Sequence, residues 1–240
     1  MTQNSGPRDE VFTTAVVNSN GQIADRSAHL ERMKMHAKRL RITLPDVLPK
    51  IGASEGDSQL VRISYSDKAG WDVQHRQFGI RNEEVDAISI VAPRWNTKTN
   101  GCKHGDWAPY RDARILAEKA GCDVALFVYE HALIDSDRGT PVLLDEDGTV
   151  WIPTQDDGGV DGITASVLET QLPDVGLPVV RGRLNERLVA RCLELVVVGS
   201  GLGVCRIASI DGEAVGEVTV LSERCQKIIN QHFTQEATWS

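Results

Sequence analysis

The 240-residue sequence contains no apolar run long enough to cross a membrane, and its first residues lack the hydrophobic core of an export signal. Its five cysteines form no C-x-x-C pair, so we expect reduced thiols and a cytoplasmic protein. The formal net charge of -8 and the lack of a long basic run argue against binding to nucleic acid. Neither a GxGxxG nor a Walker A motif is present, and we predict no metal site. What remains is an ordinary globular composition, 41% hydrophobic and 25% charged.

Hydrophobic periodicity predicts a fold of the mixed α+β or α/β class. In the first half we expect helices at 28–41 and 46–52, and strands at 11–17, 22–25, 60–65, 71–78 and 88–92. In the second half we expect helices at 107–120, 162–171, 185–193 and 222–233, and strands at 123–129, 132–135, 141–144, 149–153, 195–199 and 204–210. The polar stretch 93–100 is a predicted linker. It separates an N-terminal α/β lobe, 1–92, from a C-terminal α/β lobe, 101–240.

Lys103 lies just before a strongly patterned part of the chain. The helix predicted at 107–120 has one apolar face, Gly121 is suited to end it, and an apolar run of strand length follows. Lysines are usually exposed, but this lysine is tethered beside a buried helix–strand unit. We therefore expect Lys103 to be held in place rather than to lie on a free loop. Its neighbour Cys102 lacks the local base and acid that would make it a nucleophile.

Two stretches suit a phosphate group. Gly162, Ile163 and Thr164 open a predicted helix, where backbone N–H groups and the helix dipole favour an anion. Ser200 offers a hydroxyl in the glycine-rich turn 200–203. Each stretch could equally be an ordinary helix cap or an ordinary turn.

In their order along the chain, these pieces resemble the class IV, or fold-type IV, pyridoxal-phosphate enzymes. This family includes branched-chain and D-amino-acid aminotransferases and aminodeoxychorismate lyase, and the resemblance covers about residues 12–216. The sequence H-L-E-R-M at 29–33 is similar to the family's H-L-x-R-L helix, whose arginine holds the cofactor phosphate; this implies that role for Arg32. Counting back from Asp123 by the family's spacing gives Lys103 as the lysine that carries the cofactor. Lys98, in a T-K-T-N stretch, is the alternative.

The rest of the implied cofactor site follows from three further motifs. Asp135 takes the place of the family glutamate that contacts the pyridine nitrogen, and Thr140 takes that of a family asparagine. The stretch 162–165 is similar to the family's G-I-T-R, with Ala165 instead of arginine, and Ser200 matches the last phosphate contact. The resemblance thus implies a pyridoxal 5'-phosphate site made of Arg32, Lys103, Asp135, Thr140, Gly162, Ile163, Thr164 and Ser200.

The resemblance also implies a fold and leaves three activities open. The expected fold has two lobes with the cofactor between them, as in D-amino-acid aminotransferase, but the N-terminal lobe is truncated, because family members usually carry more residues before the first strand. The first activity is a lyase of folate biosynthesis, which converts 4-amino-4-deoxychorismate to 4-aminobenzoate and pyruvate after Lys103 removes a ring proton. The second is a branched-chain or D-amino-acid aminotransferase. The third is a non-catalytic member, favoured by Asp135, Thr140 and the short N-terminus. A homodimer that binds a small-molecule substrate is implied in each enzymatic case.

Overall fold

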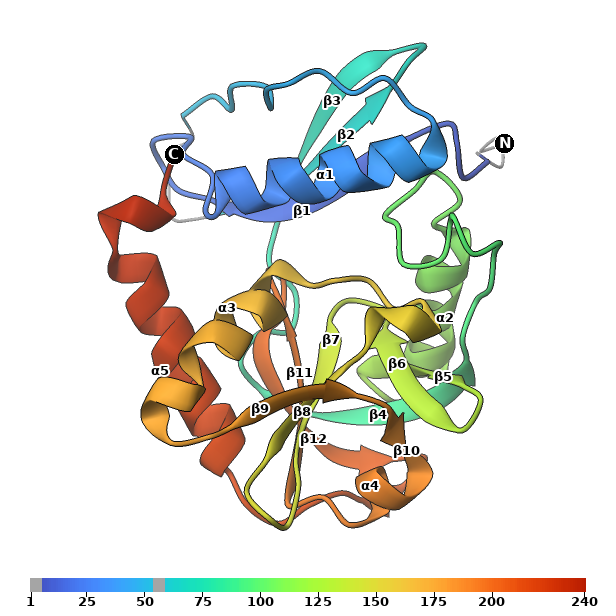
Figure 1. Cartoon of the computed structure of the whole chain (residues 1–240), viewed down its shortest axis with the longest axis vertical. Coiled ribbons are helices and arrows are strands. Elements are labelled where there is room, and N and C mark those ends of the chain that lie inside the picture. The colour runs from blue at the N-terminus through green and yellow to red at the C-terminus, as the bar shows by residue number, and fades with distance from the viewer. Residues whose placement is uncertain (1–5, 54–58) are drawn as a thin grey trace. The chain divides into compact units, whose positions relative to one another are not determined.

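The computed structural model describes residues 6–53 and 59–240, and the chain divides into two compact units (Figure 1). The first unit comprises Met1–Gly79, Trp95–Ala108 and His232–Ser240. The second comprises Ile80–Arg94 and Pro109–Gln231. Each unit is assembled from segments that are apart in the sequence, whereas the predicted lobes were continuous. Lys103 consequently belongs with the N-terminal segment rather than with the residues that follow it.

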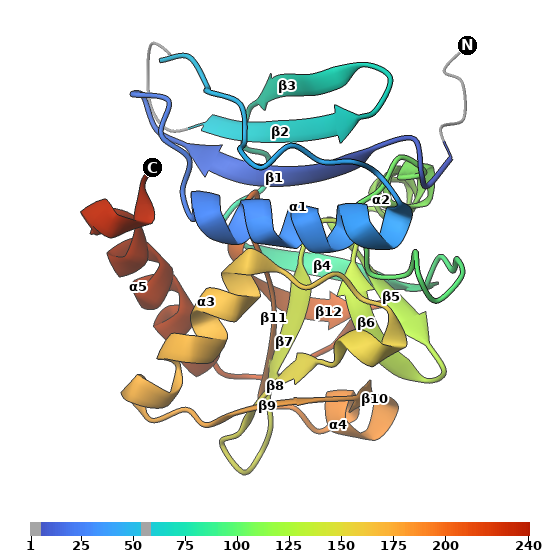
Figure 2. The ribbon, with the colours of Figure 1, turned by 45° about the horizontal axis from the view of Figure 1, so that its top comes forward.

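The first unit is a three-stranded antiparallel sheet covered by one helix (Figure 2). The sheet has the order β1 (Val11–Val17), β2 (Gln59–Ser66) and β3 (Gly70–Arg76), and helix α1 (Arg26–Leu40) packs on β1. Val61 and Ile63 of β2 and Met33 of α1 are completely buried. An antiparallel sheet with one covered face needs such an apolar layer on that face.

Helix α1 has a buried face at the spacing of a surface helix, formed by His29, Arg32, Met33, His36, Ala37 and Leu40. It ends where Arg41 takes a left-handed conformation, with φ 62°. Three members of the buried face are basic side chains. Such side chains are rarely fully buried unless they have a specific partner, so this face calls for an explanation beyond packing.

The second unit is built on a ten-stranded mixed sheet of order β10-β6-β5-β4-β12-β11-β7-β8-β9, with β13 paired to β12. The pairs β4–β5, β4–β12 and β8–β9 are parallel. The strands are β4 (Glu84–Val91), β5 (Val124–Tyr129), β6 (Ala132–Ser136), β7 (Thr140–Leu144), β8 (Val150–Pro153), β9 (Val179–Gly182), β10 (Leu184–Asn185), β11 (Glu194–Gly199), β12 (Gly203–Ile210) and β13 (Glu213–Ala214). The helices are α2 (Ala108–Lys119), α3 (Ile163–Gln171), α4 (Glu186–Ala190) and α5 (Val220–Thr234), with single 3₁₀ turns at Gln155–Asp157, Pro173–Val175 and Glu236–Thr238.

The core of the second unit is apolar and lies on the central strands. Leu126, Leu143, Leu195 and Ile207 are completely buried there. Helix α3 packs against β11, and Figure 1 shows α3 and α5 on the same side of the sheet. Within the described ranges, no helix has both the length and the apolar character to cross a membrane.

Two predicted elements are wrong. The helix predicted at 46–52 is absent, because Pro49 has no N–H to donate to a helix and Leu48 gives its carbonyl to Arg26 Nη2 at 2.7 Å. The strand predicted at 22–25 shrinks to isolated bridges, Val17 with Ile23 and Ala24 with Trp239. In both places backbone groups find partners outside a regular element.

Candidate functional site

A row of polar side chains runs along the buried face of α1. Arg32 Nη2 donates to the hydroxyl of Thr13 on β1 at 2.8 Å, and that hydroxyl lies 2.6 Å from His29 Nδ1. One turn after Arg32, His36 Nδ1 accepts the backbone N–H of Lys103 at 3.2 Å. Helix α1 therefore brings Arg32 and the Lys103 segment together.

The electrostatics of this row are those of a cationic site. Burial lowers the pKa of His29 and of His36 well below 6.5, and Arg32 and then Lys103 lower both pKa values further. Both histidines are therefore neutral at pH 7. Among the residues that the structure describes, no carboxylate is a cause of either shift. Arg32 and Lys103 thus place two positive charges near each other in buried surroundings, an arrangement suited to an anionic ligand.

The side chain of Lys103 lies among aromatic rings. Its Nζ is 4.9 Å from the ring centroid of Trp107 and 5.2 Å from that of Phe12, and these two rings meet edge to face. Lys103 is partly accessible, whereas the alternative Lys98 is exposed, and its carbonyl accepts a hydrogen bond from Arg39. An amine over aromatic faces is held by cation–π attraction while it stays reachable by a ligand.

The two neighbours of Lys103 are buried and chemically quiet. Burial raises the pKa of the Cys102 thiol to about 11, so it is not a thiolate at neutral pH. Burial lowers the pKa of His104 to about 4. The His104 ring meets the rings of Trp95 and Trp107 edge to face, and within the described chain neither of its nitrogens has a hydrogen-bond partner. His104 therefore acts as a packed aromatic ring.

A further cation lies beside the same aromatic pair. The Arg62 guanidinium carbon is 3.4 Å from the ring centroid of Phe12, and Arg62 pairs with Glu10. Phe12 is therefore contacted by Arg62 and lies near the amine of Lys103. Because a guanidinium binds carboxylates well, Glu10 is a suitable partner for Arg62, and a ligand carboxylate would compete with it.

In the second unit, Asp135 is a buried carboxylate held by donors. Its Oδ2 accepts the Tyr110 hydroxyl at 2.9 Å and the Val160 N–H at 3.0 Å, and its Oδ1 accepts the Ser136 N–H at 3.0 Å. Burial, and then the Asp135 charge, raise the pKa of Tyr110 well above 10, so the phenol keeps its proton and stays a donor. Asp135 thereby fixes the loop before α3 to β6.

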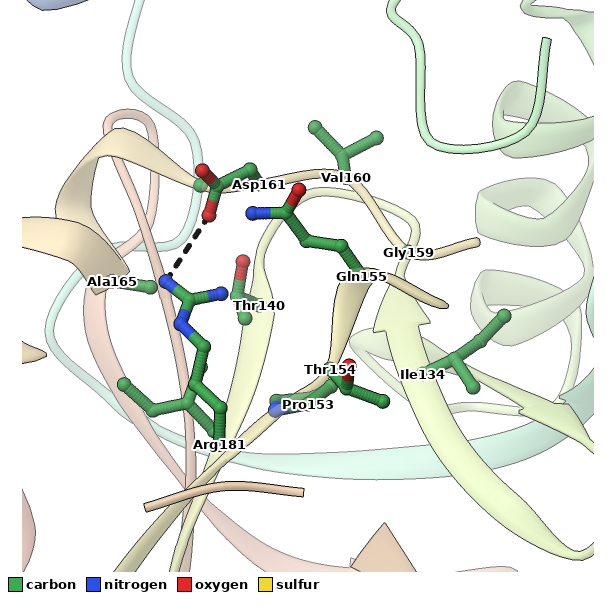
Figure 3. Close-up of a pocket in the computed structure, with 12 residues that line it drawn as sticks. Ile134, Thr140, Pro153, Thr154, Gln155, Gly159, Val160, Asp161, Ala165 and Arg181 are labelled. Carbon is green, nitrogen blue, oxygen red and sulfur yellow. Dashed lines mark hydrogen bonds and ion pairs between the residues drawn. The ribbon is translucent and has the colours of Figure 1, made fainter. Parts of the chain in front are cut away.

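Thr140 and Gly162 line a small cavity of about 10 Å³, which is large enough for about one water molecule (Figure 3). A Cβ on Gly162 would stand 2.5 Å from Thr140 Oγ1, so only glycine fits here without displacement. Arg181 borders the cavity and pairs with Asp161 and Glu169. In Figure 3, Arg181 reaches past Ala165 toward Asp161, so β9 supplies a guanidinium near the position where α3 carries alanine.

The start of α3 has the features of an anion site. In the part of the chain that the structure describes, no side chain caps it, and Gly162, Ile163 and Thr164 are half-buried there. Uncapped N–H groups at a helix start attract an anion. Ser200 lies half-buried in the turn after β11, on which α3 packs.

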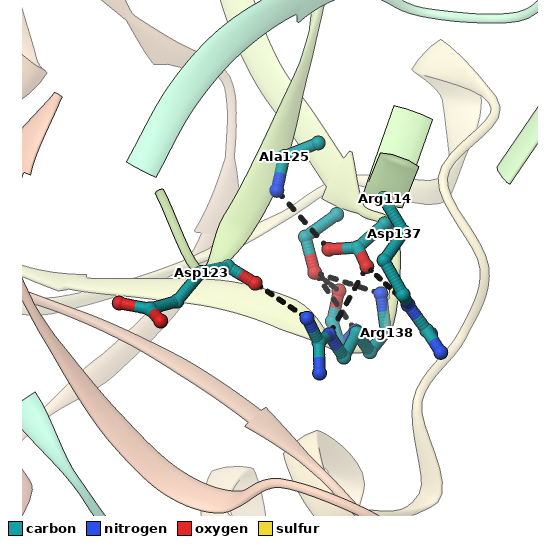
Figure 4. Close-up of polar contacts among 7 residues, drawn as sticks. Arg114, Asp123, Ala125, Asp137 and Arg138 are labelled. Atoms are coloured by element: carbon teal, nitrogen blue, oxygen red, sulfur yellow. Dashed lines mark hydrogen bonds and ion pairs between the residues drawn. The ribbon is translucent and has the colours of Figure 1, made fainter. Parts of the chain in front are cut away.

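The turn between Asp135 and Thr140 is fixed by the buried carboxylate of Asp137 (Figure 4). Asp137 Oδ2 pairs with Arg114 Nε at 3.0 Å and Arg138 Nε at 3.1 Å, and Oδ1 accepts the Ala125 N–H at 3.1 Å. This network ties the turn to α2 and β5, and so sets where β6 ends and β7 begins.

The predicted site residues thus fall into two groups. Arg32 and Lys103 lie close together in the first unit, whereas Asp135, Thr140, Gly162, Ile163, Thr164 and Ser200 belong to the second. Sequence reasoning missed Thr13, His36 and Arg62, and gave His29 no role of its own. A usable signal existed on α1, since His29, Arg32 and His36 share the face of Met33 and Leu40. Tyr110 gave no such signal.

Comparison with known proteins identifies relatives of this fold. The profile of the class IV aminotransferases matches residues 10–210. A branched-chain aminotransferase from Thermoproteus uzoniensis, in complex with norvaline, has a TM-score of 0.83 at 18% identity, covering 97% of this chain and 90% of that chain. A candidate 4-amino-4-deoxychorismate lyase from Legionella pneumophila has 0.77 at 20% identity, covering 97% and 96%. A hypothetical aminotransferase from Mycobacterium tuberculosis in its PLP-bound form has 0.78 at 16%, covering 94% and 89%. No curated protein matches the sequence.

Proposed function

The chain belongs to the class IV aminotransferase family, whose members are enzymes that depend on pyridoxal 5'-phosphate, and we propose that it is a lyase that uses this cofactor to convert 4-amino-4-deoxychorismate to 4-aminobenzoate and pyruvate. The predicted family and the fold-type IV architecture are confirmed by the profile match and the shared fold. The observation that carries the cofactor proposal is that buried Arg32 and half-buried Lys103 both lie near two neutral histidines.

The residues present fit the cofactor. A site with two neighbouring cations suits a ligand that has both a phosphate and a carbon that an amine can attack. Gly162 supports the fit, because a Cβ there would fill the space beside the Thr140 hydroxyl at the uncapped start of α3. Bound pyridoxal 5'-phosphate supplies an electron sink that stabilises negative charge on the substrate.

The chain's own residues have distinct tasks in this proposal. Arg32 holds the phosphate by charge-assisted hydrogen bonds. Lys103 Nζ would hold the cofactor, and this amine would take the proton from the substrate ring carbon. The family resemblance assigns Thr140, Gly162, Ile163, Thr164 and Ser200 to the phosphate side, and Asp135 to the pyridine nitrogen. That assignment rests on their motifs and on the surroundings of each residue in its own unit.

Arg62 is the proposed receptor for a substrate carboxylate. It lies on the ring of Phe12, which is also the ring near Lys103 Nζ. The reaction removes a proton from the substrate ring and releases the enolpyruvyl group as pyruvate. All atoms of the substrate are then found in two acids, 4-aminobenzoate and pyruvate. A cation beside the lysine can orient such an acid by its carboxylate.

The first test is covalent attachment of the cofactor. We expect borohydride treatment of the protein with pyridoxal 5'-phosphate to fix one pyridoxyl group on Lys103, identified by mass spectrometry of the digested chain. Lys103→Ala is expected to abolish the label, and Lys98→Ala serves as the matched control that keeps it. A label that survives Lys103→Ala and disappears in Lys98→Ala would assign the cofactor to Lys98 instead.

The second test separates the lyase from an aminotransferase. The lyase needs no second substrate, so pyruvate and 4-aminobenzoate should accumulate in equal amounts over many turnovers without any 2-oxo acid. An aminotransferase stops after one half-reaction unless a 2-oxo acid is added. The adjacent residues Lys103 and His104 are similar to a Lys-His sequence in aminodeoxychorismate lyases, and this similarity favours the lyase. The alternative keeps the same residues, and branched-chain aminotransferases are among the proteins that share the fold.

The assembly and the location are also proposals. The family resemblance implies a homodimer, which light scattering of the purified protein would test by its mass. A cytoplasmic location agrees with five cysteines that form no disulfide. A non-catalytic role would require that no cofactor becomes attached to either lysine in the first test.

A further inference from the structure

We propose that His36 is a positioning residue for Lys103, which it holds through a hydrogen bond to the lysine's backbone. One of its two tests, attachment of pyridoxal 5'-phosphate to Lys103, rests on the proposed function. The hydrogen bond itself can be tested without any ligand.

Lys103 is held on both sides of its peptide backbone. Its N–H donates to His36 Nδ1 at 3.2 Å, and its carbonyl accepts the Phe12 N–H at 3.2 Å. The first contact comes from α1 and the second from β1. The backbone from which the reactive side chain extends is therefore clamped between the helix and the sheet of the first unit.

Helix α1 also holds the residues before Lys103. Arg39 donates to the carbonyls of Thr97 at 3.2 Å, Lys98 at 3.1 Å and Asn100 at 2.5 Å. His36 and Arg39 are therefore two successive contacts from one helix to one loop. Arg39 is exposed and His36 is buried, so His36 makes the contact that water cannot easily replace.

The same helix carries Arg32, four residues before His36. A helix is rigid over one turn, so α1 sets the distance between the guanidinium and the Lys103 backbone. Geometry of this kind matters, because a reactive group displaced by about 1 Å loses much of its rate. His36 thereby couples the proposed phosphate-binding arginine to the lysine that would carry the cofactor.

The contact requires one protonation state of His36. Nδ1 can accept the Lys103 N–H only when it carries no proton, so a neutral ring has its proton on Nε2. After burial, the groups that disfavour a proton on His36 are the cations Arg32, Lys103 and Arg39 and, when it is protonated, the neighbouring His104. All of them oppose a proton on His36, and so does its burial. The surroundings therefore keep Nδ1 available as an acceptor.

The experiment compares His36→Leu, which removes the acceptor, with His36→Asn, whose side-chain oxygen can take the place of Nδ1. Without ligand, hydrogen exchange at the Lys103 amide, normalised to amides of β2, should become about tenfold faster in His36→Leu. With pyridoxal 5'-phosphate, borohydride-trapped attachment to Lys103 should slow about tenfold. Binding of pyridoxine 5'-phosphate, which has an alcohol instead of the aldehyde, should change less than about twofold. In His36→Asn the attachment rate should recover to at least a third of the wild-type rate, and exchange at the Lys103 amide should stay within about threefold of wild type.

Leu40→Ala is the control for simple destabilisation. Leu40 is buried one turn further along the same helix, belongs to the apolar core of the first unit and has a side chain that cannot hydrogen-bond to the Lys103 backbone. It should lower stability without changing the normalised exchange at Lys103. Wild-type exchange in His36→Leu, or equal effects of His36→Leu and Leu40→Ala, would overturn the positioning role. If the wild type attaches no cofactor, the proposed function fails, and the exchange measurement still decides the role of His36.

Discussion

Acid should destabilise this protein partly through His104, and replacing that residue by phenylalanine should remove this part of the loss. His104 is completely buried and meets the rings of two tryptophans edge to face, and burial lowers its pKa to about 4. In the unfolded chain the same ring has a pKa near 6.5. Below pH 6.5 the unfolded state therefore takes up a proton that the folded state refuses.

The sign and the size of the effect follow from linkage. A histidine whose pKa is lowered by folding contributes its full stability above the unfolded pKa, and this contribution disappears as the pH falls from about 6.5 toward 4. With these two pKa values, the free energy of unfolding falls by about 2 kcal/mol between pH 7 and pH 5 because of His104 alone. His104→Phe keeps an aromatic ring between Trp95 and Trp107 but cannot bind a proton.

The assay is urea unfolding of the wild type and of His104→Phe at pH 7 and at pH 5. At each pH, the free energy of unfolding of the wild type is subtracted from that of the variant. A packing change contributes equally at both pH values, so the change in this difference from pH 7 to pH 5 measures protonation alone. We expect the variant to gain about 2 kcal/mol relative to the wild type at the lower pH. His75→Phe, which replaces an exposed histidine in the same unit, should gain little. The reasoning is refuted if the advantage of His104→Phe is the same at both pH values.

Three further predictions concern local contacts. Gly162→Ala should lower the free energy of unfolding by about 1–3 kcal/mol, because its Cβ would meet Thr140 Oγ1 at 2.5 Å; Gly52→Ala, which has open space, should not. Asp137→Ala should cost about 3 kcal/mol or more in urea unfolding, since it leaves Arg138 without its buried counter-charge; a loss under 1 kcal/mol would contradict this. Cys102 should resist iodoacetamide at pH 8 in the folded protein, because its pKa is raised to about 11, and rapid labelling found by mass spectrometry would show otherwise.

Local pattern was sufficient where an element buries one face along its whole length. The strand predicted at 11–17 is β1 with the same bounds, because six of its seven positions are buried. The helix predicted at 28–41 is α1 to within two residues, since Met33, Ala37 and Leu40 repeat at helical spacing. In these segments the periodicity of the side chains directly reflects the surface against which they pack.

Long-range pairing could not be predicted in this way. Strand β4 pairs in parallel with β12, more than a hundred residues later in the chain, and this pairing places β4 in the second unit. Backbone hydrogen bonds between strands carry no sequence signature of their own. Strand β9 was missed for a related reason, because it lies at the edge of its sheet and none of its residues is fully buried.

The candidate site was predicted from motifs only in part. The motifs led us to propose Arg32 and Lys103, and in the structure α1 contacts the segment that carries Lys103. They did not identify Thr13 or His36, because a threonine in a strand and a histidine in a helix gain meaning only from what faces them. The Thr13 hydroxyl is recognisable as part of the site only once Arg32 and His29 are seen on either side of it.

The buried polar groups of the two units argue for different roles. In the second unit, buried acids act as structural clamps: Glu194 accepts the N–H groups of Leu221 and Ser222 at the start of α5, and Asp137 ties a turn to its neighbours. In the first unit, α1 buries Arg32 near a second cation and against a neutral hydroxyl. Burying a cation is costly unless hydrogen bonds and charges around it compensate for the lost water. The buried basic face of α1 is therefore the part of the first unit at which we propose that the anionic ligand binds.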